Sequence, residues 1–210
     1  MQEYADMQAE DVAVLLHDRF PNPSILEIGA NDGEDTARML RVMPTSTVVA
    51  FEPDPRALVR LRAALGSNPR VRIEGKAVGN INGSVPWFAS NIDDLPNGLV
   101  WDKSSSLRTP TDHIKVSPEI YFTQDYTVEC VRLDDVDLPP FDFAWIDVQG
   151  SQRDVIAGGY ATLSRIPYIY IECHNYPLYE GEPRPEELFA MFPDHRPTGK
   201  WGQNYLFEKG

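Results

Sequence analysis

Short apolar runs alternate along this chain with segments in which apolar residues recur every three or four positions. The apolar runs lie at residues 25–28, 47–51, 71–74, 143–146 and 168–173. Their short length is typical of strands, whereas the spacing at 34–43, 55–65 and 151–163 predicts helices. Alternation of this kind predicts an α/β fold, doubly wound around a mostly parallel sheet.

Weaker patterns predict the remaining elements. We expect a leading amphipathic helix at 7–20, a short helix at 185–192 and a C-terminal antiparallel hairpin at 198–209. Residues 77–79, followed by Asn82-Gly83 and an apolar return at 85–88, predict an earlier hairpin. We see no internal repeat, and we expect residues 1–210 to form a single domain.

Residues 90–126 differ from the rest of the chain because they are rich in Asn, Asp, Ser and Pro and have no sustained periodicity. We interpret this stretch as an insertion or lid on the substrate side of a ligand cleft. Its aromatic and serine side chains, with two just before it, are candidates to cover a substrate, although local packing is the commoner role. They are Trp87, Phe88, Trp101, Ser104, Ser105, Ser106, Tyr121 and Phe122.

Composition narrows the choice of partners. The 210-residue chain has a net charge of −13 and no basic run, which argues against nucleic acid and anionic membranes as partners. Cys130 and Cys173 both fall in strand-like runs and are expected to be buried free thiols. With no leader or anchor pattern, we expect a cytoplasmic protein. The sequence does not specify an oligomeric state.

Two strand ends carry the candidate chemistry. The strand at 25–28 runs into a Gly29–Gly33 turn that opens a helix, and the strand at 47–51 ends in Glu52. An acid about twenty residues after such a turn is placed to bind ribose hydroxyls. The acids around this turn suit an ammonium and a ribose but would repel a pyrophosphate. These features predict S-adenosylmethionine as the cofactor.

The chain resembles the FkbM family of S-adenosylmethionine-dependent methyltransferases from about residue 24 to its end. The matching motifs are Glu27-Ile28-Gly29-Ala30-Asn31-Asp32-Gly33, Phe51-Glu52-Pro53, Lys76-Ala77-Val78-Gly79, Val131-Arg132-Leu133-Asp134-Asp135 and Ile146-Asp147-Val148 with Gly150, Val155 and Gly158. The resemblance implies a class I methyltransferase fold, which is Rossmann-like. It also implies methyl transfer, commonly to a hydroxyl of a natural product or sugar.

We expect the cofactor-binding residues to cluster at these strand ends. They are Glu27, Gly29, Asn31, Asp32, Gly33, Glu52, Pro53, Ala77, Val78 and Asp147. Glu52 is the strongest candidate, since one carboxylate can accept from both ribose hydroxyls. Asp32 has a competing role as a helix cap. Ala77 and Val78 can equally be core residues.

Asp147, Glu172 and His174 are the candidate catalytic residues. Each follows or ends an apolar strand, and alternation places Glu172 and His174 on one side. His174 is a candidate base for an acceptor hydroxyl, with Glu172 holding its tautomer, although it could instead bond backbone. His113 is a second candidate base but is more simply a solvated side chain. Methyl transfer chiefly needs in-line alignment, so a base is not essential.

Gln149 and Gln152 stand where the resemblance leads us to expect acids. Hard divalent cations prefer charged oxygens, so we predict no metal site. Two other function classes stay open at this point. A nicotinamide-dependent oxidoreductase would need a further glycine at the turn, and a nucleoside-binding module without turnover would bind cofactor but form no product.

Overall fold

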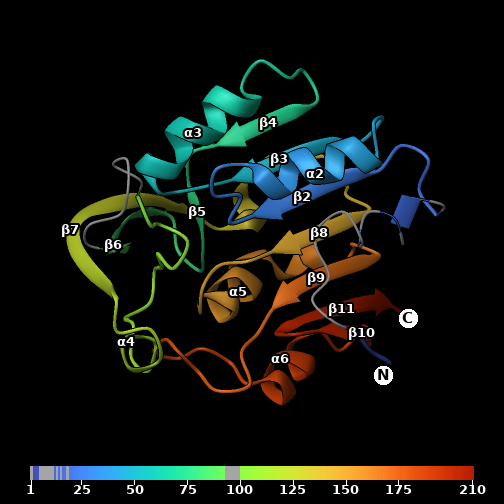
Figure 1. The fold of residues 1–210 in the computed structure, drawn as a ribbon. Helices are drawn as coiled ribbons and strands as arrows, with labels where there is room; N and C mark the ends of the chain where they lie inside the picture. The colour runs from blue at the N-terminus through green and yellow to red at the C-terminus, as the bar shows by residue number, and fades with distance from the viewer. Residues whose placement is uncertain (1, 5–11, 13, 15, 18, 93–99) are drawn as a thin grey trace.

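The computed structural model describes residues 2–4, 12, 14, 16–17, 19–92 and 100–210. Its main sheet has eight strands (Figure 1). In spatial order they are β1 (Gln2–Tyr4), β10 (His195–Trp201), β11 (Asn204–Lys209), β9 (Tyr168–Glu172), β8 (Phe143–Ile146), β2 (Ser24–Ile28), β3 (Thr47–Phe51) and β4 (Val71–Glu74). The strands from β9 to β4 are all parallel, and β10 and β11 form the antiparallel hairpin. The predicted α/β fold is therefore confirmed.

Period-two alternation sends side chains from each central strand into two separate cores. On β2, Ile25 packs into one core and Leu26 into the other, and the same division recurs on β3, β8 and β9. Helices α2 (Glu34–Val42) and α3 (Pro55–Leu65) cover the first face, and α5 (Gln152–Leu163) and α6 (Pro185–Met191) cover the second (Figure 1). A sheet buried on both faces needs such continuous apolar runs.

The helix that follows β3 begins where its sequence predicts. Asp54 is the N-cap of α3, its side chain accepts from the Arg56 backbone N–H, and Pro55 occupies the first helical position. This cap fixes the direction in which the chain leaves β3. The turn that contains Glu52 is therefore held between a strand and a capped helix.

A second, three-stranded sheet corrects the predicted early hairpin. β5 (Ala77–Val78) pairs in parallel with β7 (Ile120–Val131), and β6 (Gly83–Ile92) pairs antiparallel with β7 on its other side. Asn82-Gly83 is thus not the tip of a two-residue hairpin. The Asn82 side chain instead accepts from the Arg132 N–H and donates to Asp135, which ties the turn to the end of β7.

The predicted insertion at 90–126 overlaps these strands, since β6 runs to Ile92 and β7 starts at Ile120. Between them lies the short helix α4 (His113–Val116), while residues 93–99 lie outside the described part. Most of the predicted leading helix also lies outside the described residues. β1, which the sequence pattern did not predict, pairs in parallel with β10.

Two further expectations concern the chain as a whole. Cys130 and Cys173 are buried free thiols, as predicted. In the described part of the chain, no helix has the length and apolar character that crossing a bilayer requires.

Candidate functional site

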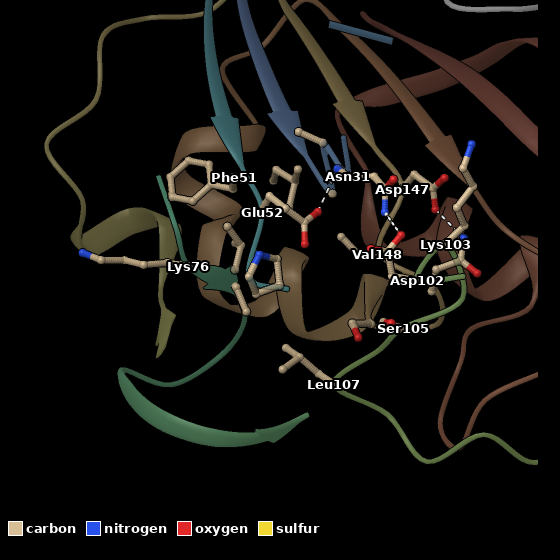
Figure 2. Close-up of a pocket in the computed structure, with 18 of the residues that line it drawn as sticks. Asn31, Phe51, Glu52, Lys76, Asp102, Lys103, Ser105, Leu107, Asp147 and Val148 are labelled. Carbon is tan, nitrogen blue, oxygen red and sulfur yellow. Dashed lines mark hydrogen bonds between the residues drawn. The ribbon is translucent and has the colours of Figure 1, made fainter. Parts of the chain in front are cut away.

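A cavity of about 230 Å³ lies at the carboxyl ends of β2, β3 and β8 (Figure 2). Parallel α/β sheets bind ligands at this edge. Of the predicted cofactor-binding residues, eight line it: Gly29, Asn31, Asp32, Glu52, Pro53, Ala77, Val78 and Asp147. The predicted residues that do not line it are Glu27 and Gly33.

Gly29 makes the edge of the cavity possible. It has a φ of 90°, and a Cβ on it would lie 1.7 Å from the Asp147 carbonyl oxygen. Its N–H donates to the Phe51 carbonyl at 2.9 Å. The ends of β2, β3 and β8 therefore converge on a backbone position that only glycine can occupy.

Glu52 is held by two backbone donors at the floor of this cavity. Its Oε2 accepts from the Asn31 N–H at 2.8 Å and its Oε1 from the Asp54 N–H at 2.7 Å. Burial raises the pKa of the Glu52 carboxyl to about 8, against the lowering effect of these two bonds. Each oxygen retains a further lone pair, so the carboxylate can accept two hydroxyls from a ligand.

Glu27 and Gly33 lie outside the cavity lining for different reasons. Glu27 belongs to β2 and shares the face of Ile25, so its buried carboxyl lies under α2 and accepts from the Thr36 hydroxyl. Burial raises the pKa of Glu27 to about 8. Gly33 caps α2 with a φ of 83°, and a Cβ there would lie 2.6 Å from Leu61 of α3. Their positions fit structural roles rather than direct ligand contact.

Asp32 lines the cavity and also bonds to the start of α2. Its Oδ1 accepts from the Glu34 N–H at 3.2 Å, but the N-cap of α2 is Gly33, so Asp32 supports the helix start without being its cap. Asn31 beside it has a φ of 47°, and its Oδ1 is buried without a hydrogen-bond partner among the described residues. The turn thus offers the cavity one unused acceptor.

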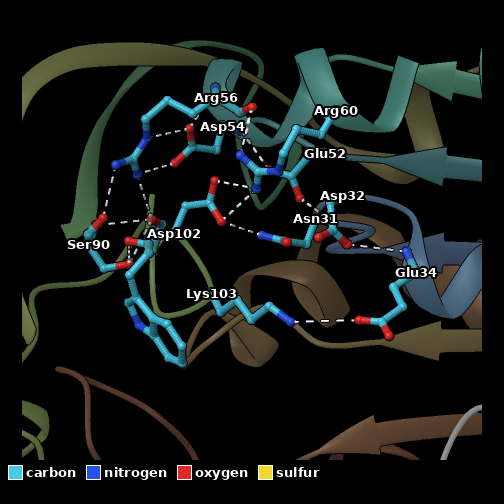
Figure 3. Close-up of polar contacts among 12 residues, drawn as sticks. Asn31, Asp32, Glu34, Glu52, Asp54, Arg56, Arg60, Ser90, Asp102 and Lys103 are labelled. Atoms are coloured by element: carbon cyan, nitrogen blue, oxygen red, sulfur yellow. Dashed lines mark hydrogen bonds and ion pairs between the residues drawn. The ribbon is translucent and has the colours of Figure 1, made fainter. Parts of the chain in front are cut away.

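Residues 101–108, here called the strap, close the cavity on the side away from the sheet. Asp102, Lys103, Ser105 and Leu107 all line the cavity. Asp102 is buried and accepts from both Arg60 Nη2, at 2.7 and 2.9 Å, and Asn31 Nδ2, at 3.1 Å (Figure 3). Lys103 Nζ lies 3.9 Å from Glu34 Oε2, and both side chains are exposed.

Asp102 is a site residue that was not predicted, because its loop holds several other polar residues of similar local pattern. Its one signal is an acid beside the aromatic Trp101 in an otherwise polar stretch, which is too weak to predict a buried ion pair. Trp87 lines the cavity, whereas Phe88, Tyr121 and Phe122 line a shallow groove elsewhere. The aromatic residues therefore do not form one lid.

At the β8 end of the cavity, an amide joins two carboxyl groups. Gln149 Nε2 donates to Asp147 Oδ1 at 2.6 Å and to Glu172 Oε2 at 2.9 Å. Burial, and then the charge of Asp147, raise the pKa of Glu172 well above its usual range. Gln152 is fully buried and donates to the Glu172 carbonyl. The two amides hold the carboxyl pair where the resemblance had predicted further acids.

His174 has a different partner from the one predicted. Its Nδ1 lies 2.6 Å from Glu182 Oε1, whereas its Nε2 lies 3.9 Å from Glu172 Oε1. Glu172 is therefore too far to hold the tautomer. Glu182 lies in the irregular loop after β9, and no periodic pattern in the sequence predicts its return to His174.

His113 is buried, so its simpler interpretation as a solvated residue is wrong. Its ring contacts Phe122 edge-on and also lies against Tyr179. Burial, and then the nearby His174, lower the pKa of His113. Its Nδ1 has no hydrogen-bond partner among the described residues, so it is a poor candidate for a positioned base.

In the described part of the chain, no group of three or more His, Cys, Asp or Glu side chains is arranged to hold a metal ion. The absence of a metal from the reaction remains a prediction.

The fold and the cavity define a class I methyltransferase architecture, and two solved structures share it. One is the methyltransferase FkbM from Methylobacillus flagellatus KT, with a TM-score of 0.62 and 16% identity over 97% of this chain. The chain spans about half, 48%, of that protein. The other is an O-methyltransferase from Bacillus cereus in complex with SAH, with a TM-score of 0.53 and 17% identity, covering 95% of this chain and 78% of that one.

Sequence comparison then identifies the family. Residues 27–203 match the methyltransferase FkbM domain, and the chain belongs to this family. The 2-O-methyltransferase NoeI of Sinorhizobium fredii (strain NBRC 101917 / NGR234) is 40% identical over 177 residues, which cover 82% of this chain and 72% of that protein. The resemblance inferred from the motifs is confirmed.

Proposed function

We propose that this protein transfers a methyl group from S-adenosylmethionine to a hydroxyl of a small molecule, such as a sugar or another natural product. The observation that carries the proposal is Glu52, a buried carboxylate fixed by two backbone N–H groups in the cavity of an FkbM-family chain. The printed name of the relative NoeI, a 2-O-methyltransferase, supports a hydroxyl as the acceptor.

The residues present fit such a cofactor. Asn31 Oδ1 is a buried acceptor with no hydrogen-bond partner in the described part of the chain, which suits an ammonium, and Glu52 suits a pair of ribose hydroxyls. Ala77 and Val78 offer an apolar wall for an adenine. When bound, S-adenosylmethionine supplies a methyl group on a sulfonium, which is already a good leaving group.

The role of the protein is then to align the methyl donor with the acceptor hydroxyl and to exclude water from the cavity. The strap lines the cavity, and Asp147 and Gln149 form its polar end, with Glu172 hydrogen-bonded behind Gln149. Holding the donor and the acceptor hydroxyl in line removes most of the entropic barrier to the reaction. The acidic cavity also argues against a pyrophosphate cofactor, in agreement with membership of a methyltransferase family.

Calorimetry with S-adenosylhomocysteine and with NADH, each in EDTA and in Mg²⁺, tests the cofactor. We expect binding of S-adenosylhomocysteine that does not depend on the metal, and no binding of NADH. NADH binding alone would overturn the proposal.

A panel of methyl glycosides and phenols, incubated with S-adenosylmethionine and analysed by mass spectrometry, tests the acceptor. We expect a methyl ether on at least one of them. Cofactor binding without any product over the whole panel would favour a binding module that lacks turnover.

A further inference from the structure

The loop after β9 buries an acid that the predicted catalytic set does not include. Glu182 is 3% exposed, and its Oε2 accepts from the backbone N–H groups of Leu178, at 2.6 Å, and Tyr179, at 3.2 Å. Its Oε1 lies 2.6 Å from His174 Nδ1. A buried carboxylate is costly unless donors surround it, and these three N–H groups supply them.

This arrangement decides which nitrogen of His174 carries the proton. An ionised carboxylate can only accept hydrogen bonds, so Nδ1 must donate to Glu182. Neutral His174 then has its proton on Nδ1 and a free lone pair on Nε2. Among the described residues, Nε2 makes no hydrogen bond, since Glu172 Oε1 is 3.9 Å away.

The free nitrogen lies toward Glu172, which is hydrogen-bonded to Gln149 of the cavity lining, whereas His174 itself does not line the cavity. Glu172, on the far side of Nε2, is joined through Gln149 to Asp147, which lines the cavity. The charged or titratable groups near the imidazole are Glu182 from its own loop, Glu172 from β9 and His113 from α4. Nε2 is thus the one nitrogen of this imidazole that can meet an acceptor hydroxyl.

We propose that Glu182 is a positioning residue that fixes His174 as its Nδ1–H tautomer, so that Nε2 takes the proton of the acceptor hydroxyl. The proton-transfer step rests on the proposed function, whereas the tautomer does not. In this step the acceptor oxygen forms the new O–C bond to the methyl group. The C–S bond of the donor breaks with its electron pair remaining on sulfur, and the hydroxyl proton passes to Nε2.

Nitrogen-15 NMR of histidine-labelled protein tests the tautomer directly. In buffer alkaline enough for a neutral imidazole, we expect His174, assigned with His174→Gln, to carry its proton on Nδ1. In Glu182→Gln the amide oxygen can keep the two backbone donors while its NH₂ group faces Nδ1. The proton should then move to Nε2. The matched control is Glu180→Gln, the same change at an exposed position of the same loop, which should leave the tautomer unchanged.

Two outcomes would overturn the inference: an Nε2–H tautomer in the unaltered protein, or the same tautomer in Glu182→Gln. Calorimetry with S-adenosylhomocysteine separates this failure from that of the proposed function, because Glu182 does not line the cavity and its variant should bind with unaltered affinity. With the glycoside and phenol panel, we expect methyl transfer by Glu182→Gln to be slower by at least about tenfold. An unaltered rate in a variant with the inverted tautomer would overturn the base role of Nε2.

Discussion

Glu27 and Glu52, at the ends of neighbouring strands, show how far a sequence can predict the role of a single side chain. Glu52 follows the last residue of β3, where the chain is already turning, and it lines the cavity. Glu27 is inside β2, so the alternation of the strand commits its side chain to the face under α2. The sequence predicted an acid at each end, and a stricter use of the two-residue period would have separated their roles. The partner of His174 was beyond reach because it depends on the path of an irregular loop.

Replacing Glu52 tests the central residue of the cavity. Above pH 8, where the Glu52 carboxyl is ionised, we expect Glu52→Ala to weaken binding of S-adenosylhomocysteine by about 1.5–3 kcal/mol, the range for hydrogen bonds to a charged group. Calorimetry would show this as a roughly ten- to hundredfold higher Kd. Glu74→Ala is the matched control, because Glu74 ends the adjacent strand, pairs with Arg72 and does not line the cavity. Equal affinities for the two variants would refute the ribose role of Glu52.

At the scale of elements, local patterns predicted the central strands and helices well but not every pairing. The helix at Pro55–Leu65 and the strand at Phe143–Ile146 have the predicted bounds, because capping, apolar runs and proline placement are local signals. The pairing of β5 with β7 joins residues more than fifty positions apart, and no local signal encodes it. The Asn82-Gly83 pair was misleading for the same reason, since its side-chain partners, Arg132 and Asp135, follow the end of β7.

Two ion pairs hold the strap, Asp102 with Arg60 and Arg108 with Asp154, and the first gives a prediction about this element. In Asp102→Asn the ion pair with Arg60 Nη2 is lost, so we expect faster hydrogen exchange at residues 101–108 and several-fold weaker binding of S-adenosylhomocysteine. Exchange mass spectrometry and calorimetry would measure the two effects. Partly exposed pairs contribute little, whereas a buried carboxylate such as Asp102 depends on its partner.

The neighbouring residue supplies the control. Lys103 is paired with Glu34 at 3.9 Å, and both side chains are more than half exposed. Lys103→Ala should therefore leave the exchange of the strap almost unaltered, although it lies one residue away. If both variants behave alike, the strap is held by its other contacts, such as the bond from Ser106 Oγ to the Gln149 carbonyl, rather than by Asp102.

For the whole molecule, buried acids and net charge act on stability in the same direction. Glu27 and Glu52 have pKa values raised from 4.5 to about 8, chiefly by burial, so the folded state binds more protons than the unfolded state between these values. The free energy of unfolding therefore falls as pH rises through this window. The net charge of −13 at pH 7 adds self-repulsion that also grows with pH.

Glu27→Gln separates the two contributions. The amide keeps an acceptor for the Thr36 hydroxyl but cannot ionise, so the fall in unfolding free energy should be shallower by up to about 1 kcal/mol per pH unit. Urea unfolding at a series of pH values from about 5 to about 8 would measure the slope of unfolding free energy against pH for the unaltered protein and for the variant.

Asp54 does not contribute to this slope. Burial acts to raise the pKa of its carboxyl, but Arg56 lowers it further, so Asp54 stays ionised throughout this range. Glu129→Gln, the same substitution on an exposed position of β7, removes a surface carboxyl without the burial. Equal slopes for the two variants would mean that repulsion alone sets the pH dependence, and a shallower slope for Glu27→Gln alone would assign it to the buried acid under α2.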